Sequence, residues 1–198
     1  MDYFILKRIF DFFLALIGLI LFSPLILIIT ISILLEDGPP ILYRKKSLGK
    51  DGKVFDAFKF RSMKANSPMI TKVGKLFRKT AMDELPQLFN IAKGEMSFVG
   101  PRNYGINKYG IEQDFKGGKV ELQKLNPKMA DFSKRLEVTP GLTGLAQIFA
   151  PKYATDEEVL RLDLEYIKNR NFFFDLRLIF VSLWITFANR WESVTYKI

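Results

Sequence analysis

RKTAMDELPQLFNIAKGEMSFVGPR, residues 78–102, carries the strongest local structural signals of this sequence. A proline is compatible only with the first turn of a helix, so Pro86 marks a helix start, and Gly94 is suited to end the same helix. Asp83 stands just ahead of that turn and has the side chain of an N-cap residue. The stretch predicts a short helix over residues 84–93, followed by a Gly-Pro-Arg corner.

The adjacent acids Asp83 and Glu84 allow two interpretations. Acidic residues at a helix start complement the helix dipole, and a purely structural role would explain them. A helix start also attracts phosphate, and two carboxylates would repel that phosphate unless a divalent cation lay between them. Arg78, Lys79 and Lys93 stand close by in the sequence and supply further positive charge. The stretch by itself leaves both interpretations open.

Composition limits the chemistry. The 198 residues suffice for one domain with an appendage, and they include no cysteine and no histidine. Disulfides, thiolate chemistry and zinc–thiolate sites are excluded, as is histidine acid–base catalysis. An enzyme of this composition takes its nucleophile and base from Asp, Glu, Ser, Thr, Tyr or Lys, and its metal is a hard ion such as Mg²⁺. The net charge of +9 indicates an anionic partner: nucleic acid, anionic lipid or a phosphorylated substrate.

An apolar segment near the N-terminus indicates contact with a membrane. Residues 12–35 contain no charged side chain, and a straight helix of this length, about 36 Å, would cross a bilayer core. Ser23-Pro24 lies at the centre, where proline kinks a helix. Basic residues flank both ends, at positions 7–8 and 44–46, so the positive-inside rule assigns no orientation. Two topologies stay open: a re-entrant helix that bends at Ser23-Pro24, and a kinked single span.

The breaker EDGPP, residues 36–40, ends the membrane segment, so we divide the chain into residues 1–36 and residues 37–198. ILYRKK and VFDAFKFRSM, on either side of SLGKDGK, predict a two-stranded hairpin. Residues 64–77 form a connector to the helix that carries Arg78. Residues 107–131 indicate helix and loop pieces.

The C-terminal part predicts two helices. TPGLTGLAQIF, residues 139–149, indicates a Pro-Gly turn and an extended apolar piece. Residues 156–170 have the pattern of an amphipathic helix capped by Asp156. Its inner face consists of Val159, Leu160, Leu162 (or Asp163), Tyr166 and Ile167. The aromatic-rich segment that follows is either a helix in the bilayer interface, with Trp184 and Trp191 near head groups, or a core helix. The fold class is α+β and mainly helical.

Five pieces of this sequence, in this order, resemble the bacterial sugar transferase family of small monotopic phosphoglycosyl transferases. They are the apolar segment with Ser23-Pro24, FKFRSM, the block from DELPQ to GPR, PGLTGLAQ, and DLEYIKN with FFFDLRLIF. The resemblance covers nearly the whole chain. It implies that residues 1–36 form a re-entrant membrane helix and residues 37–198 a cytosolic catalytic domain seated on the membrane by interfacial amphipathic helices. It further implies the cytoplasmic face of the bacterial inner membrane and the minimal catalytic form of the family.

The resemblance also implies a reaction. Such enzymes move a phospho-sugar from a UDP-sugar to undecaprenyl phosphate, release UMP, require Mg²⁺ and begin the assembly of a surface glycan. Asp83 matches the family's nucleophile, which forms a covalent phospho-sugar intermediate, and Glu84 matches its partner. We expect Asp83 to contact the metal as well. The absence of His and Cys agrees with an aspartate nucleophile.

Four further residues are expected at the substrate: Lys59, Arg78, Pro101 and Arg102. The last two fall on the family's Pro-Arg-Pro motif, which is associated with the nucleotide. Here Asn103 replaces the second proline, which leaves the uridine contacts undefined. After PGLTGLAQ the family often continues with Asn-Gly-Arg, whereas this chain reads IFAPKYAT and offers only a lysine, at position 152.

Three alternatives accompany this hypothesis. Transfer could be direct, in a ternary complex, with Asp83 only a magnesium ligand. The chain could be an inactive membrane-anchored scaffold whose basic face recruits lipid or a partner. A nucleic-acid binder fits the net charge, but the membrane segment and the even spread of cations argue against it. The sugar, the glycan and the formation of a homodimer are not encoded in any motif.

Overall fold

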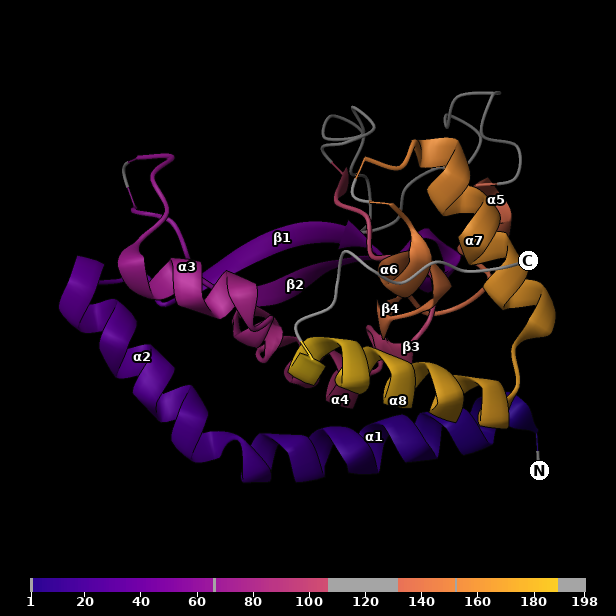
Figure 1. The fold of residues 1–198 in the computed structure, drawn as a ribbon. Helices are drawn as coiled ribbons and strands as arrows, with labels where there is room; N and C mark the ends of the chain where they lie inside the picture. Colours follow the sequence, from indigo (N-terminus) through magenta and orange to yellow (C-terminus); the bar gives the residue numbers. More distant parts are fainter. Residues whose placement is uncertain (1, 66, 107–131, 152, 189–198) are drawn as a thin grey trace.

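The computed structural model describes residues 2–65, 67–106, 132–151 and 153–188. These residues form a mainly helical α+β fold with two small sheets, as predicted (Figure 1). The elements are α1 (Tyr3–Leu21), α2 (Ser23–Asp37), β1 (Leu42–Leu48), η1 (Lys50–Gly52), β2 (Val54–Phe60), α3 (Lys72–Lys79), η2 (Met82–Glu84), α4 (Gln87–Lys93), β3 (Ser97–Val99), α5 (Phe132–Arg135), β4 (Gly141–Thr143), α6 (Leu145–Phe149), α7 (Asp156–Asn169) and α8 (Phe172–Ala188). Three features named from the sequence lie outside the described residues: the segment 107–131, Lys152 and Trp191.

The apolar N-terminal segment is a bent helix pair. Helices α1 and α2 meet at an angle of 60°, and the break falls at Ser23-Pro24, as predicted. Pro24 stands in the first turn of α2, where its missing N–H breaks no hydrogen bond, and the Ser23 hydroxyl donates to the Ile20 carbonyl (2.8 Å). Among the described helices none is long and apolar enough to cross a membrane alone, whereas α1 and α2 together meet that requirement of length and composition.

Strands β1 and β2 form the predicted antiparallel hairpin, with Tyr43 opposite Lys59. Asp51 and Gly52 turn the chain with positive φ angles of 57° and 71°. Helix α4 binds the hairpin through the buried side chain of Asn90. Its amide nitrogen donates to the Asp56 carbonyl (2.7 Å) and its oxygen accepts from the Phe58 N–H (3.0 Å). The hairpin and the helix after the acidic pair therefore form one unit.

The predicted helix over residues 84–93 begins later than expected. Residues Met82–Glu84 form a separate 3₁₀ turn, the α-helix starts at Gln87, and Pro86 occupies the cap position without a side-chain cap. Asp83 is therefore not the N-cap, and that part of the prediction is wrong. The helix ends at Gly94, as predicted, because this residue adopts a left-handed φ of 85° that glycine tolerates best.

The Gly-Pro-Arg corner packs against the Pro-Gly-Leu-Thr-Gly segment. Strands β3 and β4 pair in parallel, Ser97 with Gly141 and Val99 with Thr143. A Cβ atom at Gly141 would lie 2.1 Å from the Gly100 nitrogen, so the two segments approach too closely for any side chain there. The extended apolar piece predicted after Thr143 is instead the short helix α6. A short apolar run does not distinguish helix from strand by its pattern, which explains the error.

Helices α7 and α8 form the C-terminal core together with α6, Val99 and Tyr104. The cap of α7 is Thr155, which forms a capping box with Glu158, so the expected cap at Asp156 is wrong. Its buried residues are Val159, Leu162, Asp163 and Tyr166, whereas Leu160 and Ile167 are half-buried. Leu178 and Ile185 of α8 join this core. Each fully buried aliphatic side chain of this kind stabilises the fold by about 1.5–3 kcal/mol.

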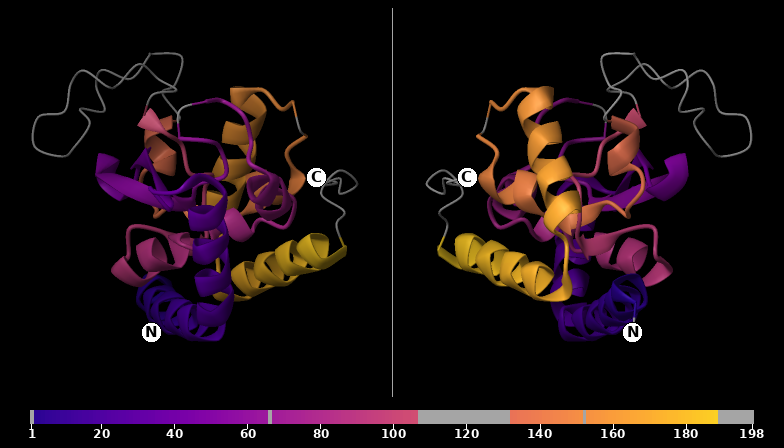
Figure 2. Two further views of the ribbon diagram at one scale, coloured as in Figure 1. Left: turned by 90° about the vertical axis from the view of Figure 1, so that its left-hand side faces the viewer. Right: turned by 90° about the vertical axis from the view of Figure 1, so that its right-hand side faces the viewer.

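Helix α8 has one core face and one exposed aromatic face. Phe173, Phe180 and Trp184 are 81%, 69% and 69% exposed. Helix α8 lies alongside α1, and both run along the same side of the molecule in all three views (Figures 1 and 2). Helix α1 also carries exposed large apolar side chains, among them Ile17 and Ile20. The core-helix interpretation of this segment is therefore confirmed, whereas its position in a bilayer interface stays a prediction.

Candidate active site

Asp83 lies in the wall of a cavity of about 540 Å³. The cavity lies where β2, the last turn of α3 and the turn η2 meet. Its charged residues are Lys59, Arg61, Arg78, Asp83 and Glu84. The remaining wall consists of Tyr43, Phe60, Ser62, Met63 and Ala81. Four residues predicted from the sequence (Lys59, Arg78, Asp83 and Glu84) are therefore brought together, although they come from three separate elements.

The turn that presents the acidic pair depends on Ala81. This residue has a left-handed φ of 54°, uncommon for alanine, and it redirects the chain from α3 into η2. The Leu85 N–H then donates to the Met82 carbonyl (3.2 Å) and closes the 3₁₀ turn around Asp83 and Glu84. The sequence pattern predicts both acids at a helix start, whereas the turn η2 places them on the cavity wall.

The two acids differ in their surroundings. Glu84 forms an ion pair with Lys59, whereas Asp83 forms no ion pair with any residue of the described ranges. Burial raises the pKa of Asp83 above its usual range, and the negative charge of Glu84 adds to this. The positive charges of Lys59 and Arg78 act in the opposite direction. Asp83 is thus the half-buried, unpaired carboxylate of the site, with two cations near it.

The cavity also contains two adjacent carboxylates that could bind a magnesium ion together with a substrate. No group of three acidic side chains that would hold a metal alone occurs among the described residues. Mg²⁺ is commonly bound by one or two carboxylates together with the phosphates of a substrate, and the adjacent acids Asp83 and Glu84 provide such a pair.

Two cavity residues that the sequence analysis did not assign to the substrate are Arg61 and Ser62. Both belong to the FKFRSM piece that also contains Lys59, so this piece was the signal in the sequence that could have indicated them. Arg61 is buried and pairs with the Asp37 carboxylate at 2.9 Å, and it also donates to the Gly38 carbonyl (2.7 Å) at the end of α2. Ser62 accepts a hydrogen bond from Arg78 Nε (2.8 Å).

Pro101 and Arg102 do not line the Asp83 cavity. They line a separate, much smaller pocket together with Tyr104 and Arg135. The Arg102 N–H donates to the buried Asp163 carboxylate (2.9 Å), which also pairs with Arg135 at 2.7 Å. Burial raises the pKa of Asp163 to about 6, against the opposing charge of Arg135. The Arg102 backbone is thus fixed while its side chain is exposed.

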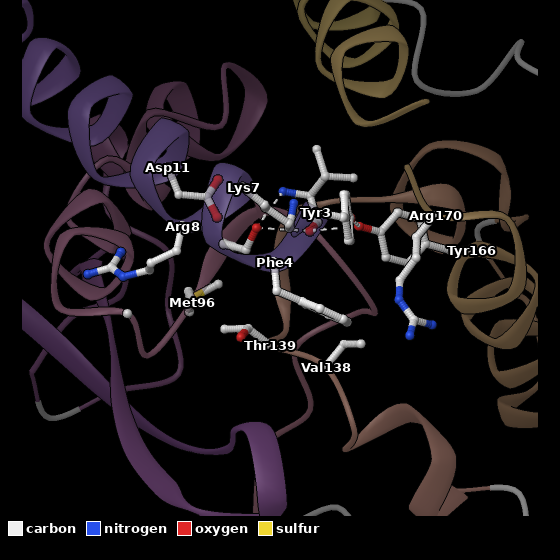
Figure 3. Close-up of a pocket in the computed structure, with 13 residues that line it drawn as sticks. Tyr3, Phe4, Lys7, Arg8, Asp11, Met96, Val138, Thr139, Tyr166 and Arg170 are labelled. Atoms are coloured by element: carbon white, nitrogen blue, oxygen red, sulfur yellow. Dashed lines mark hydrogen bonds between the residues drawn. The ribbon is translucent and has the colours of Figure 1, made fainter. Parts of the chain in front are cut away.

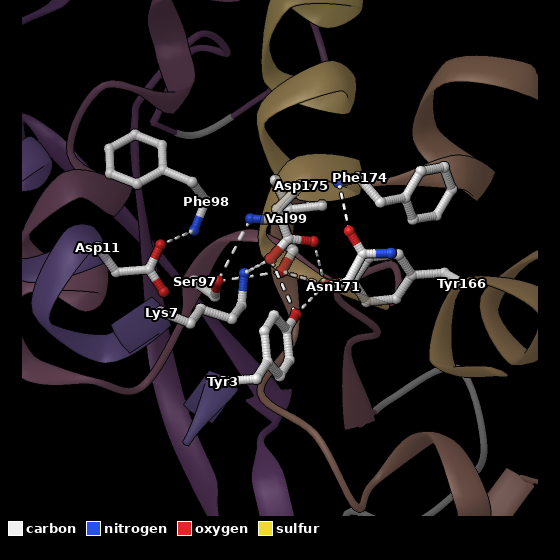
Figure 4. Close-up of polar contacts among 10 residues, drawn as sticks. All are labelled: Tyr3, Lys7, Asp11, Ser97, Phe98, Val99, Tyr166, Asn171, Phe174 and Asp175. Carbon is white, nitrogen blue, oxygen red and sulfur yellow. Dashed lines mark hydrogen bonds and ion pairs between the residues drawn. The ribbon is translucent and has the colours of Figure 1, made fainter. Parts of the chain in front are cut away.

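A second polar site joins α1 to α8. It borders a pocket of about 60 Å³ under the first turns of α1 (Figure 3). Asp175 accepts hydrogen bonds from Lys7 (2.7 Å), Tyr3 (2.9 Å) and Tyr166 (2.8 Å), and Figure 4 shows these groups converging on its carboxylate. On the same side, Asp11 accepts from the Phe98 N–H (3.1 Å). These bonds hold the N-terminal helix on the C-terminal core.

Comparison with known proteins gives a consistent result. Residues 2–189 match the family described as "Bacterial sugar transferase". UDP-glucose:undecaprenyl-phosphate glucose-1-phosphate transferase of Escherichia coli (strain K12) is 33% identical over 203 residues, covering 94% of this chain and 41% of that protein. Exopolysaccharide production protein PSS of Rhizobium leguminosarum bv. phaseoli is 34% identical over 194 residues, covering 89% of this chain and 92% of that protein.

A third relative differs in its sugar. UDP-N-acetylgalactosamine-undecaprenyl-phosphate N-acetylgalactosaminephosphotransferase of Aeromonas hydrophila is 34% identical over 197 residues, covering 91% of this chain and 43% of that protein. The chain thus spans about two fifths of the Escherichia and Aeromonas proteins and most of the Rhizobium protein.

Proposed function

The chain belongs to the bacterial sugar transferase family, and from this premise we propose that it transfers a sugar phosphate from a UDP-sugar to undecaprenyl phosphate, with release of UMP. The proposed product, undecaprenyl-diphospho-sugar, would begin the assembly of a surface glycan. The observation that carries the proposal is Asp83, an unpaired carboxylate in the wall of a large cavity with Lys59 and Arg78 beside it. The names of the relatives from Escherichia and Aeromonas support the same donor and acceptor classes.

In the proposed reaction Asp83 is the nucleophile. Its carboxylate oxygen attacks the phosphorus that carries the sugar, the bond from that phosphorus to the bridging oxygen breaks, and UMP leaves with that oxygen and its electron pair. Undecaprenyl phosphate then attacks the same phosphorus and regenerates the free carboxylate. Acyl phosphates of this kind are a known form of covalent catalysis. The half-buried position of Asp83 favours this role because a less hydrated carboxylate is a stronger nucleophile.

The cations have a separate task. Lys59 and Arg78 would bind the negatively charged diphosphate and stabilise the charge that develops as UMP leaves. Mg²⁺ held by Asp83 and Glu84 would neutralise further charge on the diphosphate. Lys59 also forms an ion pair with the Glu84 carboxylate. This ion pair would hold the carboxylate to one side, so that it does not repel the incoming phosphate.

The proposal includes a location on the cytoplasmic face of the bacterial inner membrane. Both ends of the bent helix pair are bound by ion pairs to the rest of the fold. Lys7 of α1 pairs with Asp175 of α8, and Asp37 of α2 pairs with Arg61, the residue that follows β2. A pair held in this way re-enters on the side from which it came and carries the exposed apolar faces of α1 and α8 into the bilayer. The lipid acceptor would then approach from the same membrane.

The test is UMP release from a panel of UDP-sugars, including UDP-glucose and UDP-N-acetylgalactosamine, in nanodiscs with undecaprenyl phosphate and Mg²⁺. We expect release with at least one donor, loss of release with a chelator, and loss in Asp83→Asn. The matched control is Asp51→Asn, because Asp51 is an exposed turn residue whose left-handed φ asparagine tolerates. If Asp83→Asn were as active as the control, the assignment of Asp83 as the nucleophile would be refuted.

Direct transfer in a ternary complex is the second candidate mechanism, with Asp83 as a magnesium ligand only. Incubation with donor labelled in its sugar and without acceptor separates the two. The covalent route leaves label on the protein in an amount equal to the UMP released, and the label is absent from Asp83→Asn. The direct route leaves no label and requires acceptor for any UMP.

A further inference from the structure

Arg78 is held at one of its three nitrogen atoms. Its Nε donates to the Ser62 hydroxyl at 2.8 Å, whereas neither terminal nitrogen has a protein acceptor in the described part of the chain. Because the guanidinium group is planar, a fixed direction of the Nε–H bond restricts the positions that both terminal nitrogens can take. A group fixed in this manner can offer its outer edge to two oxygens of one phosphate, the geometry that makes arginine–phosphate pairs strong.

Ser62 is itself rigid. It is 7% exposed, and its carbonyl accepts from the Thr71 N–H (3.1 Å) and hydroxyl (3.4 Å). Thr71 caps α3 by accepting from the Gly74 N–H (2.9 Å). Helix α3 is therefore attached to Ser62 at both ends, through its cap at the first turn and through Arg78 in its last turn.

The position of Ser62 in the chain matters as well. It follows β2 by two residues and comes three residues after Lys59, a second cation of the cavity beside Asp83. One short segment thus carries Lys59 directly and holds Arg78 by a hydrogen bond. Both cations therefore depend on this segment for their attachment to the cavity wall.

We propose that Ser62 is a positioning residue that orients Arg78 toward the anionic substrate beside Asp83. The identity of that anion, the diphosphate of a nucleotide sugar, rests on the proposed function. The orienting role does not, since it depends only on the Ser62–Arg78 bond and on the free outer edge of the guanidinium. Without the hydroxyl, Arg78 would retain its charge but lose its fixed direction.

A double-mutant cycle tests the role. Ser62→Ala removes the acceptor, Arg78→Lys removes the Nε donor but keeps a positive charge, and the combined variant removes both. A hydrogen bond to a charged group of this kind supports an effect of roughly tenfold. We expect Ser62→Ala to raise KM for the donor about tenfold in the native background, and less than about twofold in the Arg78→Lys background. Ser62→Thr, which keeps the hydroxyl, should restore most of the native KM.

The matched control is Thr80→Ala, which removes a hydroxyl that donates only to the Leu76 and Phe77 carbonyls and should change KM less than about twofold. Inorganic pyrophosphate binding, measured by calorimetry in all four members of the cycle, provides a readout that needs no turnover. If Ser62 and Arg78 are coupled in pyrophosphate affinity but the native protein releases no UMP, the positioning role is supported while the proposed function fails. Equal losses from Ser62→Ala in both backgrounds, in KM or in pyrophosphate affinity, would overturn the positioning role even if the native enzyme is active.

Discussion

The Lys7 ammonium of α1 lies 2.7 Å from the Asp175 carboxylate of α8, 168 residues further along the chain, and the two side chains are 13% and 5% exposed. Taking charges out of water is costly, so a buried pair of this kind is tolerated only when its hydrogen bonds are satisfied. Tyr3 and Tyr166 satisfy the carboxylate by donating to it. The pair therefore defines where the N-terminal helix attaches.

Asp175→Asn should destabilise the protein by about 3–5 kcal/mol, because it leaves the Lys7 charge buried without a partner. Lys7→Met combined with Asp175→Asn should be less destabilising than Asp175→Asn alone, since no unpaired charge remains. Denaturant unfolding in detergent micelles measures both. The control is Lys46→Ala, which breaks an exposed pair with Asp56 and should cost at most about 1 kcal/mol. A double variant as unstable as the single one would contradict this account of the pair.

The re-entrant topology predicts a specific labelling pattern. The chain has no cysteine, so single-cysteine variants report one position each. Asp2→Cys and Arg44→Cys, both at exposed positions, should react with a charged, impermeant thiol reagent only from the cytoplasmic side. Ile20→Cys, at a residue 75% exposed near the bend, should react from neither side because lipid covers it. Periplasmic labelling of Asp2→Cys would instead indicate a full span.

Gly74→Ala should displace α3. A Cβ atom there would lie 2.2 Å from the Ser62 carbonyl oxygen and 2.6 Å from Thr71 Oγ1, so backbone must move, and overpacking of this kind costs about 1–3 kcal/mol. Gly18→Ala is the control, because its Cβ would meet only the tip of the Leu88 side chain at 3.2 Å. We expect a lower Tm and a raised donor KM for Gly74→Ala alone. Equal Tm values for the two variants would show that α3 tolerates the shift.

The sequence was most informative where a local signal acts alone. Pro24 has no N–H to donate, so the break between α1 and α2 was predictable, and the same applies to the stop at Gly94 and to the β1–β2 hairpin. The caps were less predictable. Asp83 and Asp156 are both residue types that cap helices, but the N-cap of α4 is Pro86 and the N-cap of α7 is Thr155, which forms a capping box with Glu158.

Contacts between distant segments could not be predicted in the same way. No local pattern indicates that Ser62 meets Arg78, that Lys7 meets Asp175, or that Arg102 lies outside the Asp83 cavity. These relationships depend on how α3, α8 and the Gly-Pro-Arg corner pack, and packing is determined by the whole chain. The family resemblance supplied the identities of the residues around Asp83, whereas the structure supplied their partners.

The pH dependence of the first half-reaction should report the ionisation of Asp83. A nucleophilic carboxylate must be deprotonated, so kcat/KM falls as the pH decreases through its pKa. Burial and the Glu84 charge raise this pKa above the ordinary value of about 3.9. We therefore expect the acid limb of kcat/KM for the donor to lie above that value. The measurement is the second-order rate constant of the single-turnover UMP burst, which equals kcat/KM for the donor in a two-step transfer. Undecaprenyl phosphate is left out because its own ionisation would otherwise overlap.

Two substitutions should move that limb in opposite directions. Glu84→Gln removes a negative charge that raises the pKa of Asp83 and frees Lys59 to act on Asp83 alone, so the limb should shift to lower pH. Lys59→Met removes a positive charge that lowers the same pKa, so the limb should shift to higher pH. Both variants should also react more slowly at every pH, and a change in rate alone does not identify the ionising group. Opposite shifts would identify it as Asp83, and a limb that stays in place in both variants would assign the ionisation to another group.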